Sequence, residues 1–494
     1  MKVRWIIVVV VLLMLTGCQS KDKITTSEEL IFSGDIELSG NAVSIINSLE
    51  LDKIEYNGEK VYVIGASDLL EALGLRFPEN DIYMLANDGF FVSMDIETLA
   101  DTYFLYSKED GWCFLSEKHP VNSRVKHIVE CIVVAKEGKD MLLSDDMDLV
   151  GFNIIEEDTN IYNSFGQLRL KMNEVITITD GTTSFESTEI NVMKQYYAAK
   201  VSAFTNNKVK NIMFITHDGE IVYDFSDGYL YLNNGRMNYV DESLKHQYIN
   251  IIGLMINPPV VSVMDQYSDS IHYLENEIPV LTLFLDGFSY AQYQYIVTNA
   301  NNLFLSNVSN VAKATTVYKP VTNAGFAAMI TGESAYINGV FDRSFRELKV
   351  PNIFDYCLEN NLKSALVEGD IKILDIDTTT YLNIDKNENG YTDEEVYNKG
   401  LEISKDGLDY LMVHFHGIDD CGHDFGPYSD FTIDKIIELD AYTEELVNNW
   451  PGVVIVVADH GMHNIEAGGN HGSFRYEDMT IPYMIIYGGE YEKK

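Results

Sequence analysis

Basic residues are scarce in this chain. Its 494 residues include 35 Lys and Arg against 76 Asp and Glu, which gives a formal net charge of −41 at pH 7. Proteins that bind nucleic acids through the phosphates need clustered Lys and Arg, so the composition argues against a nucleic-acid-binding surface. The same charge implies that a bound anion needs help from a metal ion or a local dipole.

Cysteine is also rare. The five cysteines are widely spaced and follow neither a zinc-finger pattern nor that of a small disulfide-rich domain. Apart from Cys18, they are Cys113, Cys131, Cys357 and Cys421. A Cys113–Cys131 bridge and free thiols both fit the sequence.

Long hydrophobic runs are missing except near the N-terminus. Residues 1–4 include two basic side chains, and residues 5–15 are uninterruptedly apolar. That run is short for a membrane span, which needs about 20 residues, and is typical of an export signal. No other segment approaches spanning length, so the rest is expected to be soluble.

The export signal ends in Leu15-Thr16-Gly17-Cys18, which resembles the lipobox of bacterial lipoproteins. The resemblance implies cleavage before Cys18 and lipidation of its thiol. The expected protein is lipid-anchored in the cell membrane and faces the extracytoplasmic side. A plain signal peptide or membrane anchor is the alternative. We assign residues 1–18 to the signal and residues 19–31 to a polar tether.

The remaining chain divides by pattern. Residues 32–255 contain short strand-like segments separated by turn signals, which predicts a β-rich α+β accessory region, with 32–148 and 149–255 as one division into subdomains. One helix is expected there, with Ser67 as N-cap and Gly74 after its last turn. Residues 276–494 are expected to form a separate C-terminal domain.

The C-terminal domain alternates buried strands with helices. This alternation predicts an α/β fold with a doubly wound, mainly parallel sheet, in which ligands bind at the carboxyl ends of the strands. The expected strands are 278–285, 364–367, 410–415, 453–458 and 481–487, and the expected helices are 323–330, 352–360, 393–405 and 431–449.

Metal-type side chains follow several of these strands. Asp286 ends the first strand, the segment 416–423 follows the third, and Asp459-His460 ends the fourth, with His471 shortly after. A lone Asp-Gly or Asp-His pair usually marks only a turn or a packing site. Several at the strand ends of one sheet indicate a metal site, and mixed Asp and His ligands favour zinc.

The spacing of these motifs resembles the alkaline phosphatase superfamily. The resemblance covers about residues 278–494 and is strongest to the type I phosphodiesterases and nucleotide pyrophosphatases. It implies an extracytoplasmic phosphoester hydrolase with two divalent ions, zinc by preference. The motifs that carry it are Leu285-Asp286-Gly287, Thr322-Asn323 with Thr331-Gly332, Asp419-x-x-Gly422-His423-x-x-Gly426-Pro427 and Asp459-His460-Gly461-Met462.

The same resemblance assigns roles to individual residues. Thr322 is the implied nucleophile, lying between or beside the metals and forming a phosphothreonine intermediate that water hydrolyses. Because Thr322 begins a helix-like stretch, the helix dipole there also favours a phosphate. An ordinary N-cap threonine is the alternative. Asp286, Asp459 and His460 would hold one ion, and Asp419, His423 and His471 the other.

Two positions depart from the family pattern. Asn323 follows the nucleophile where nucleotide pyrophosphatases usually have Phe, as in phosphonoacetate-hydrolase relatives. Arg343 occupies the place of a phosphate-contacting asparagine, and its guanidinium could grip two phosphoryl oxygens. A surface salt bridge is the alternative for Arg343. Both departures weaken the expectation of diester and nucleotide specificity.

Other side chains and other functions carry less weight. His416 and His463 are expected to support or pack against ligands, Asp420 to support the site or be solvated, and Cys421 to face away. Residues 385–390 resemble the first half of a calcium loop but lack its final Glu. A phosphoryl or lipid-headgroup transferase and a non-catalytic binding lipoprotein are the competing functions. The sequence specifies neither the substrate nor the oligomeric state.

Overall fold

The structure is a computed structural model that describes residues 22–116, 124–136, 147–151, 155–156, 161–162, 165–185, 188–233, 236–300 and 303–489. The chain forms two compact units. Unit 1 comprises Met1–Asp140, Tyr162–Ala199 and Tyr231–Arg236, and unit 2 comprises Met141–Ile161, Lys200–Leu230 and Met237–Lys494. The predicted lipidation site Cys18 lies outside the described residues. Within them, no helix has both the length and the apolar character needed to cross a membrane.

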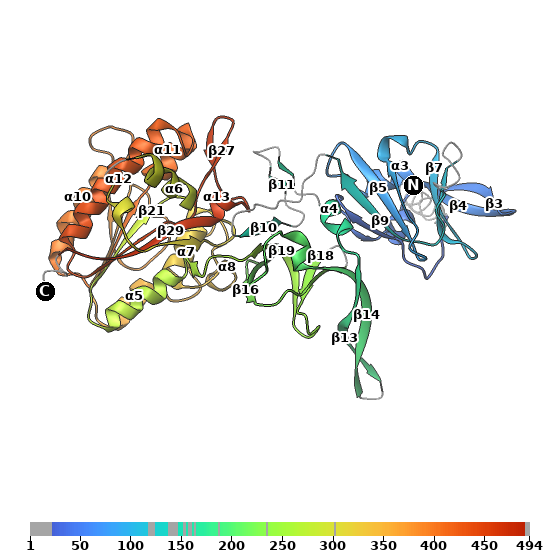
Figure 1. The fold of residues 1–494 in the computed structure, drawn as a ribbon, viewed down its shortest axis with the longest axis horizontal. Helices are drawn as coiled ribbons and strands as arrows, with labels where there is room; N and C mark the ends of the chain where they lie inside the picture. The colour runs from blue at the N-terminus through green and yellow to red at the C-terminus, as the bar shows by residue number, and fades with distance from the viewer. Residues whose placement is uncertain are drawn as a thin grey trace, which may run out of the picture. The chain divides into compact units, whose positions relative to one another are not determined.

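Unit 1 is built on two sheets with a shared apolar core and the helix α3 (Figure 1). The helix begins after Gly65 rather than at Ser67, and it ends at Gly74 as predicted, with a φ of 75°. The sheet order is β2-β1-β9-β5-β6 in one and β3-β4-β7-β8 in the other. The bounds are β1 Ile31–Gly34, β2 Gly40–Asn41, β3 Asp52–Tyr56, β4 Glu59–Gly65, α3 Ala66–Leu73, β5 Asn80–Ala86, β6 Phe91–Asp95, β7 Thr102–Ser107, β8 Gly111–Ser116 and β9 Ile128–Ala135.

The segment before β1 is packed where the structure describes it. The Ile24 side chain is buried, and its backbone N–H donates to Asn47 Oδ1 at 2.7 Å. This part of the expected tether therefore belongs to the core of unit 1. The cysteines of the described residues are all buried free thiols, so no Cys113–Cys131 bridge forms.

Unit 2 contains a small antiparallel sheet that precedes the main one. Its strands run in the order β18-β19-β15-β16, and β10 also pairs with β19. Side chains of this sheet form a cluster with Phe474 and Met479 of the C-terminal domain. The bounds are β10 Asp148–Gly151, β15 Ile212–Thr216, β16 Ile221–Asp224, β18 Arg236–Val240 and β19 Gln247–Ile256.

The main sheet of unit 2 has eight strands in the order β20-β22-β29-β26-β21-β25-β23-β24. All neighbours are parallel except β29, which runs antiparallel to β22 and β26. The predicted α/β fold with a mainly parallel sheet is confirmed. The bounds are β20 Val261–Ser262, β21 Val280–Leu285, β22 Val311–Thr315, β23 Ser364–Glu368, β24 Thr379–Leu382, β25 Tyr410–Phe415, β26 Val453–Val457 and β29 Thr480–Tyr487.

Helices cover both faces of this sheet. The helices α5, α7 and α9 lie on one face, and α10 and α12 on the other (Figure 1). Every residue of β21, β25 and β26 is buried, which explains their continuous apolar sequences. The bounds are α5 Asp265–Glu275, α6 Tyr290–Asn299, α7 Thr322–Thr331, α8 Ala335–Asn338, α9 Ile353–Glu359, α10 Asp393–Ile403, α11 Gly417–Phe425, α12 Asp430–Asn449 and α13 Tyr476–Met479.

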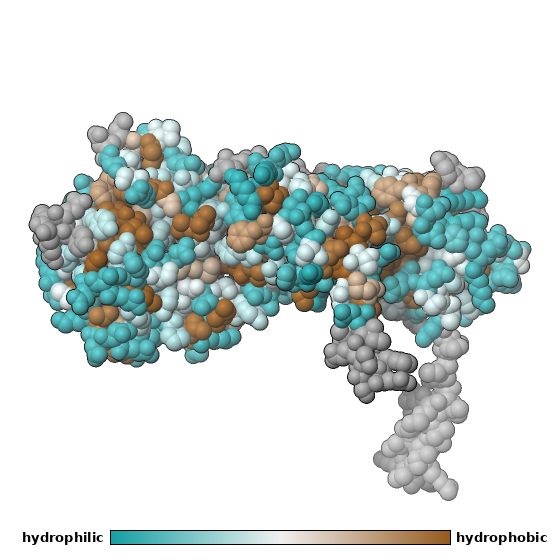
Figure 2. All heavy atoms as spheres, turned by 60° about the horizontal axis from the view of Figure 1, so that its bottom comes forward, coloured by the Kyte–Doolittle hydropathy of each residue, from teal (hydrophilic) through white to brown (hydrophobic). Residues whose placement is uncertain are grey.

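The surface agrees with the acidic composition. The face of the molecule in Figure 2 is largely hydrophilic, and its hydrophobic residues gather in separate patches.

Candidate metal centre

Asp286 lies directly after the central strand β21. Its backbone N–H donates to Phe415 O at 3.0 Å, and its side chain is only 2% exposed. The following Gly287 has a φ of 73°, and a Cβ there would lie 2.9 Å from Asp419 Cβ. Glycine is required at this turn because the backbone passes so close to Asp419.

Asp459 and His460 follow the neighbouring strand β26 and are fully buried. His460 Nδ1 lies 2.9 Å from Gly461 O, so the N–H is on Nδ1 and donates to that carbonyl. The other ring nitrogen, Nε2, lies 3.3 Å from Asp286 Oδ1 and 3.3 Å from Asp459 Oδ2. We call Asp286, Asp459 and His460 the first set.

The second set is Asp419, His423 and His471. Helix α11 carries Asp419 and His423 four residues apart, which places both on one face. The Nε2 atoms of His423 and His471 lie 3.4 and 3.5 Å from the two oxygens of Asp419. Each Nδ1 faces a backbone carbonyl instead, that of Gly469 for His423 and that of Pro320 for His471.

The two sets adjoin. The rings of His460 and His471 stack with centroids 3.8 Å apart, and those of His423 and His471 lie 5.0 Å apart. Each set also has ligand atoms within 4.8 Å of one another. The structure therefore brings together all six side chains that the sequence named as ligands, from three strand ends and two loops.

Three observations test whether metal ions fit these residues. Asp286 Oδ1, Asp419 Oδ1 and Asp459 Oδ2 are buried without a hydrogen-bond partner among the described residues. Ligands about 2.0–2.1 Å from a tetrahedral zinc ion lie about 3.3 Å apart, close to the separations within both sets. Burial and the charge of Asp286 raise the pKa of Asp459 well above its ordinary value. A cation would relieve this repulsion, so the residues fit divalent ions.

Thr322 is the first residue of α7 and faces the first set. Its Oγ1 lies 3.3 Å from His460 Nε2. Val321 is the N-cap and makes no side-chain cap, so the alternative of an N-cap threonine is wrong. Helix α7 passes close to the first set, since a Cβ at Gly325 would lie 2.4 Å from Asp459 O.

Asn323 and Arg343 join a loop to this site. Asn323 Nδ2 donates to Phe345 O at 2.9 Å, which ties the loop to the start of α7. On the same loop, Arg343 Nη2 lies 2.5 Å from His471 Nε2. Among the described residues Arg343 pairs with no acid, so the salt-bridge alternative finds no partner there.

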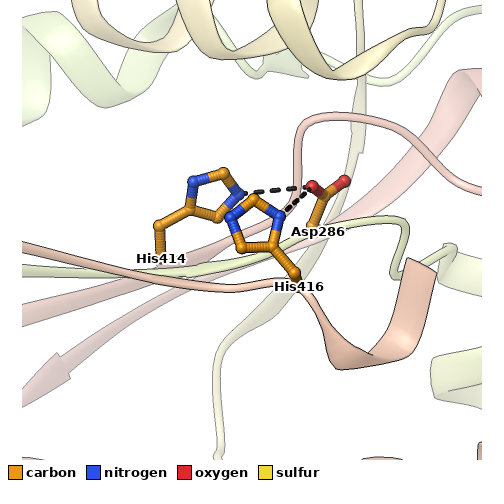
Figure 3. Close-up of side chains that lie close together, drawn as sticks. All are labelled: Asp286, His414 and His416. Carbon is orange, nitrogen blue, oxygen red and sulfur yellow. Dashed lines mark hydrogen bonds and ion pairs between the residues drawn. The ribbon is translucent and has the colours of Figure 1, made fainter. Parts of the chain in front are cut away.

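Two residues at the site were missed by the sequence interpretation. His414, on β25, and Glu368, on β23, are fully buried. His414 and His416 both point at Asp286, from which their nearest nitrogens lie 3.3 and 3.1 Å (Figure 3). The i, i+2 spacing of two histidines at a strand end was the available signal, because such residues share a face of the extended chain.

The minor candidates lie as follows. His463 Nδ1 is 2.7 Å from the buried carboxylate of Asp478. Asp420 is exposed, and Cys421 is buried. In the calcium-like loop, Asp385 accepts backbone N–H bonds from its own loop, whereas Val396, at the place of the final Glu, lies in the hydrophobic core.

Comparisons with known proteins agree with this part of the chain. Residues 374–480 match the family model described as type I phosphodiesterase / nucleotide pyrophosphatase. Among curated proteins, GPI ethanolamine phosphate transferase 2 of Yarrowia lipolytica is 27% identical over 179 residues, which are 36% of this chain and 18% of that protein. The Candida albicans protein of that name is 35% identical over 75 residues, covering 14% and 8%. The chain thus spans less than a fifth of the length of these relatives.

Solved structures match more weakly. Phosphonoacetate hydrolase from Sinorhizobium meliloti 1021 is 17% identical, with 37% of this chain and 56% of that chain covered and a TM-score of 0.31. Alkaline phosphatase from the Antarctic bacterium TAB5 is 15% identical, covering 43% and 92%, with a TM-score of 0.31. The family match includes Asp459, His460 and the whole second set. The C-terminal unit therefore carries a domain of the type I phosphodiesterase / nucleotide pyrophosphatase kind.

Proposed function

We propose that the protein is a metal-dependent phosphoester hydrolase that acts through a phosphothreonine at Thr322. Two divalent ions, zinc by ligand type, would be held by the first and second sets. One observation carries the proposal: two adjoining sets of Asp and His ligands lie beside a hydroxyl at a helix N-terminus. The family match over residues 374–480 supports the same chemistry.

The residues of the chain suggest two displacements. The Thr322 oxygen attacks phosphorus in line, forming the P–Oγ1 bond while the bond to the leaving oxygen breaks, and the hydroxyl proton is passed on to the leaving group. Water then breaks the P–Oγ1 bond, releases phosphate or a monoester, and restores the hydroxyl. When bound, the ions would lower the pKa of the attacking groups and neutralise phosphoryl charge.

Other groups would position the phosphoryl group. The first backbone N–H groups of α7 have no partners within the helix, and together with the helix dipole they favour an anion at Thr322. Arg343 reaches the same site beside His471 and carries donors for two phosphoryl oxygens. These positive groups offset the acidic character of the chain at this one place.

A transferase is the second candidate. The alignments with GPI ethanolamine phosphate transferases favour it, since an alcohol in place of water would accept the phosphoryl group from the same intermediate. The donor would then be a diester such as an ethanolamine phosphate ester. The two functions differ only in the acceptor, so the assay must measure both products.

The test is activity with zinc on bis-p-nitrophenyl phosphate, p-nitrophenyl phosphate and a nucleotide diester. Thr322→Ala should lower kcat by at least about 1,000-fold with unchanged zinc content, and Thr322→Ser should retain part of it. Full activity of Thr322→Ala would contradict the phosphothreonine. With a labelled phosphodiester, label released as phosphate or monoester supports the hydrolase, and label on an added alcohol supports the transferase.

A further inference from the structure

The two oxygens of Asp286 face different groups of ligands. Oδ1 faces His460 of the first set at 3.3 Å. Oδ2 instead faces His414 Nε2 at 3.3 Å and His416 Nδ1 at 3.1 Å, with both rings turned toward it (Figure 3). We call Asp286, His414 and His416 the third set. The two metal sets of the proposed function do not use either histidine.

His414 is held rigidly in the interior. Its ring stacks on Phe284, with centroids 3.7 Å apart and planes 6° apart. Its Nδ1 lies 3.4 Å from Glu368 Oε1, and both side chains are fully buried. When Nδ1–H donates to Glu368, the lone pair of Nε2 faces the carboxylate of Asp286. Two electron-rich atoms at this distance call for a cation between them.

The carboxylate behind His414 has the arrangement found around metal-bound histidines. Such a histidine binds the metal through one nitrogen and donates its other N–H to a carboxylate or carbonyl, which fixes the tautomer. Glu368 provides this for His414, as Gly461 O does for His460. The second oxygen of Glu368 is buried without a hydrogen-bond partner among the described residues, so this carboxylate is fixed by packing and His414.

We propose that the third set binds a third divalent ion, which shares Asp286 with the first set. The separations of 3.1 and 3.3 Å match neighbouring ligands about 2.0–2.1 Å from one ion. Two imidazoles and one carboxylate favour a transition ion such as zinc over magnesium, which prefers oxygen ligands. The His416 side chain is 20% exposed, so water can complete the coordination from that side.

The consequence for the proposed function is a positioning role. An ion on Oδ2 fixes the orientation of Asp286 and withdraws electron density from Oδ1, the oxygen that faces the first set. The third set itself does not contact Thr322. The inference rests on the proposed function only through this shared carboxylate, so the two can fail separately.

The main alternative needs no ion. A protonated His414 could donate both N–H groups, one to Asp286 and one to Glu368, and fill the same space with a positive ring. The two explanations differ in metal stoichiometry. They also differ in the spectrum of a cobalt-substituted protein, because only a bound ion adds ligand-field absorption.

The experiment measures metal content of the full chain after EDTA treatment and reloading with zinc or cobalt. We expect three equivalents for the native protein, two for His414→Ala and two for the milder His416→Gln. Asp286→Asn should lose two equivalents, because that residue belongs to two sets. His423→Ala, which alters only the second set, should lose one equivalent of different cobalt absorption, and the exposed His272→Gln should lose none.

Several results would overturn the third site. Two equivalents in the native protein, unchanged by His414→Ala and by His416→Gln, would support the protonated histidine. A third equivalent that appears with magnesium but not with zinc or cobalt would refute the assigned ion class. Fewer than two equivalents in the native protein would instead count against the proposed function. If His414→Ala does not fold, His416→Gln at the partly exposed position decides the question.

Discussion

The substitution Gly325→Ala tests how closely α7 holds Thr322 against the first set. Gly325 lies one turn after Thr322, and a Cβ there would lie 2.4 Å from Asp459 O and 2.8 Å from Asp459 Cβ. Ordinary contact needs about 3.4 Å or more, so α7 and the Asp459 backbone must separate by about 1 Å. Both partners are buried, and neither can move aside freely.

Stability and activity should respond by different amounts. Alanine in a helix interior is favoured over glycine by about 1 kcal/mol, whereas overpacking costs about 1–3 kcal/mol. The net destabilisation is therefore at most about 2 kcal/mol. A 1 Å displacement of a nucleophile can cost on the order of 100-fold in rate. We expect kcat on bis-p-nitrophenyl phosphate to fall by on the order of 100-fold in a protein that remains folded.

The assay needs a control that changes stability alone. Ala327→Gly lies in the same helix and should cost about 1 kcal/mol through helix propensity, with kcat within about twofold of the native value. Thermal melting and zinc content are measured for both variants. If Gly325→Ala keeps native kcat and native zinc content, the close contact does not position Thr322 and the reasoning is wrong.

Four further predictions follow from the site and its surroundings. Arg343→Ala should lower kcat/KM for p-nitrophenyl phosphate by on the order of 10- to 100-fold and that for the diester less, because a monoester carries the extra charge; equal losses would contradict this. In the metal-free protein, burial lowers the pKa of His416 but the Asp286 carboxylate outweighs it and raises the pKa to about 9. The resulting stabilisation is complete below the ordinary pKa of 6.5 and is lost as pH rises toward 9, so EDTA-treated protein should melt at a lower temperature at pH 9 than at pH 7, as measured by calorimetry. Phe474→Ala should destabilise the protein by about 3–5 kcal/mol and release the ion of the second set more readily in a chelator titration, whereas unchanged release would separate Phe474 from His471. Cys18→Ser should move the protein from the membrane fraction to the soluble fraction if the predicted lipidation occurs.

The main sheet could be predicted because its central strands are buried on both faces. Continuous apolar runs give such strands away, and β25 has the predicted bounds, 410–415. Helix α11 was missed because Gly417 and Gly422 and three acids interrupt its apolar pattern. Its helical conformation nevertheless explains why Asp419 and His423 meet, which spacing alone could not establish.

The site was predictable where ligands follow strands and less so where they lie within them. Asp286 and Asp459 stand out because a polar residue ends an apolar run. His414 lies inside such a run, where a histidine looks like an ordinary core residue, and its partner Glu368 comes from a strand 46 residues away in sequence. Contacts of this kind depend on strand order, which one sequence without homologues does not provide.

The cluster around Phe474 affects where the enzyme can be cut. Phe474 follows His471 by three residues and is buried against the small sheet, where Gly253 leaves room for its ring. A fragment starting at residue 276 would leave that ring and Met479 facing water, and the loop with His471 would lose its backing. The shortest active fragment should therefore retain the strands from residue 147 onward, so the polypeptide ahead of the main sheet forms part of the catalytic machinery's foundation.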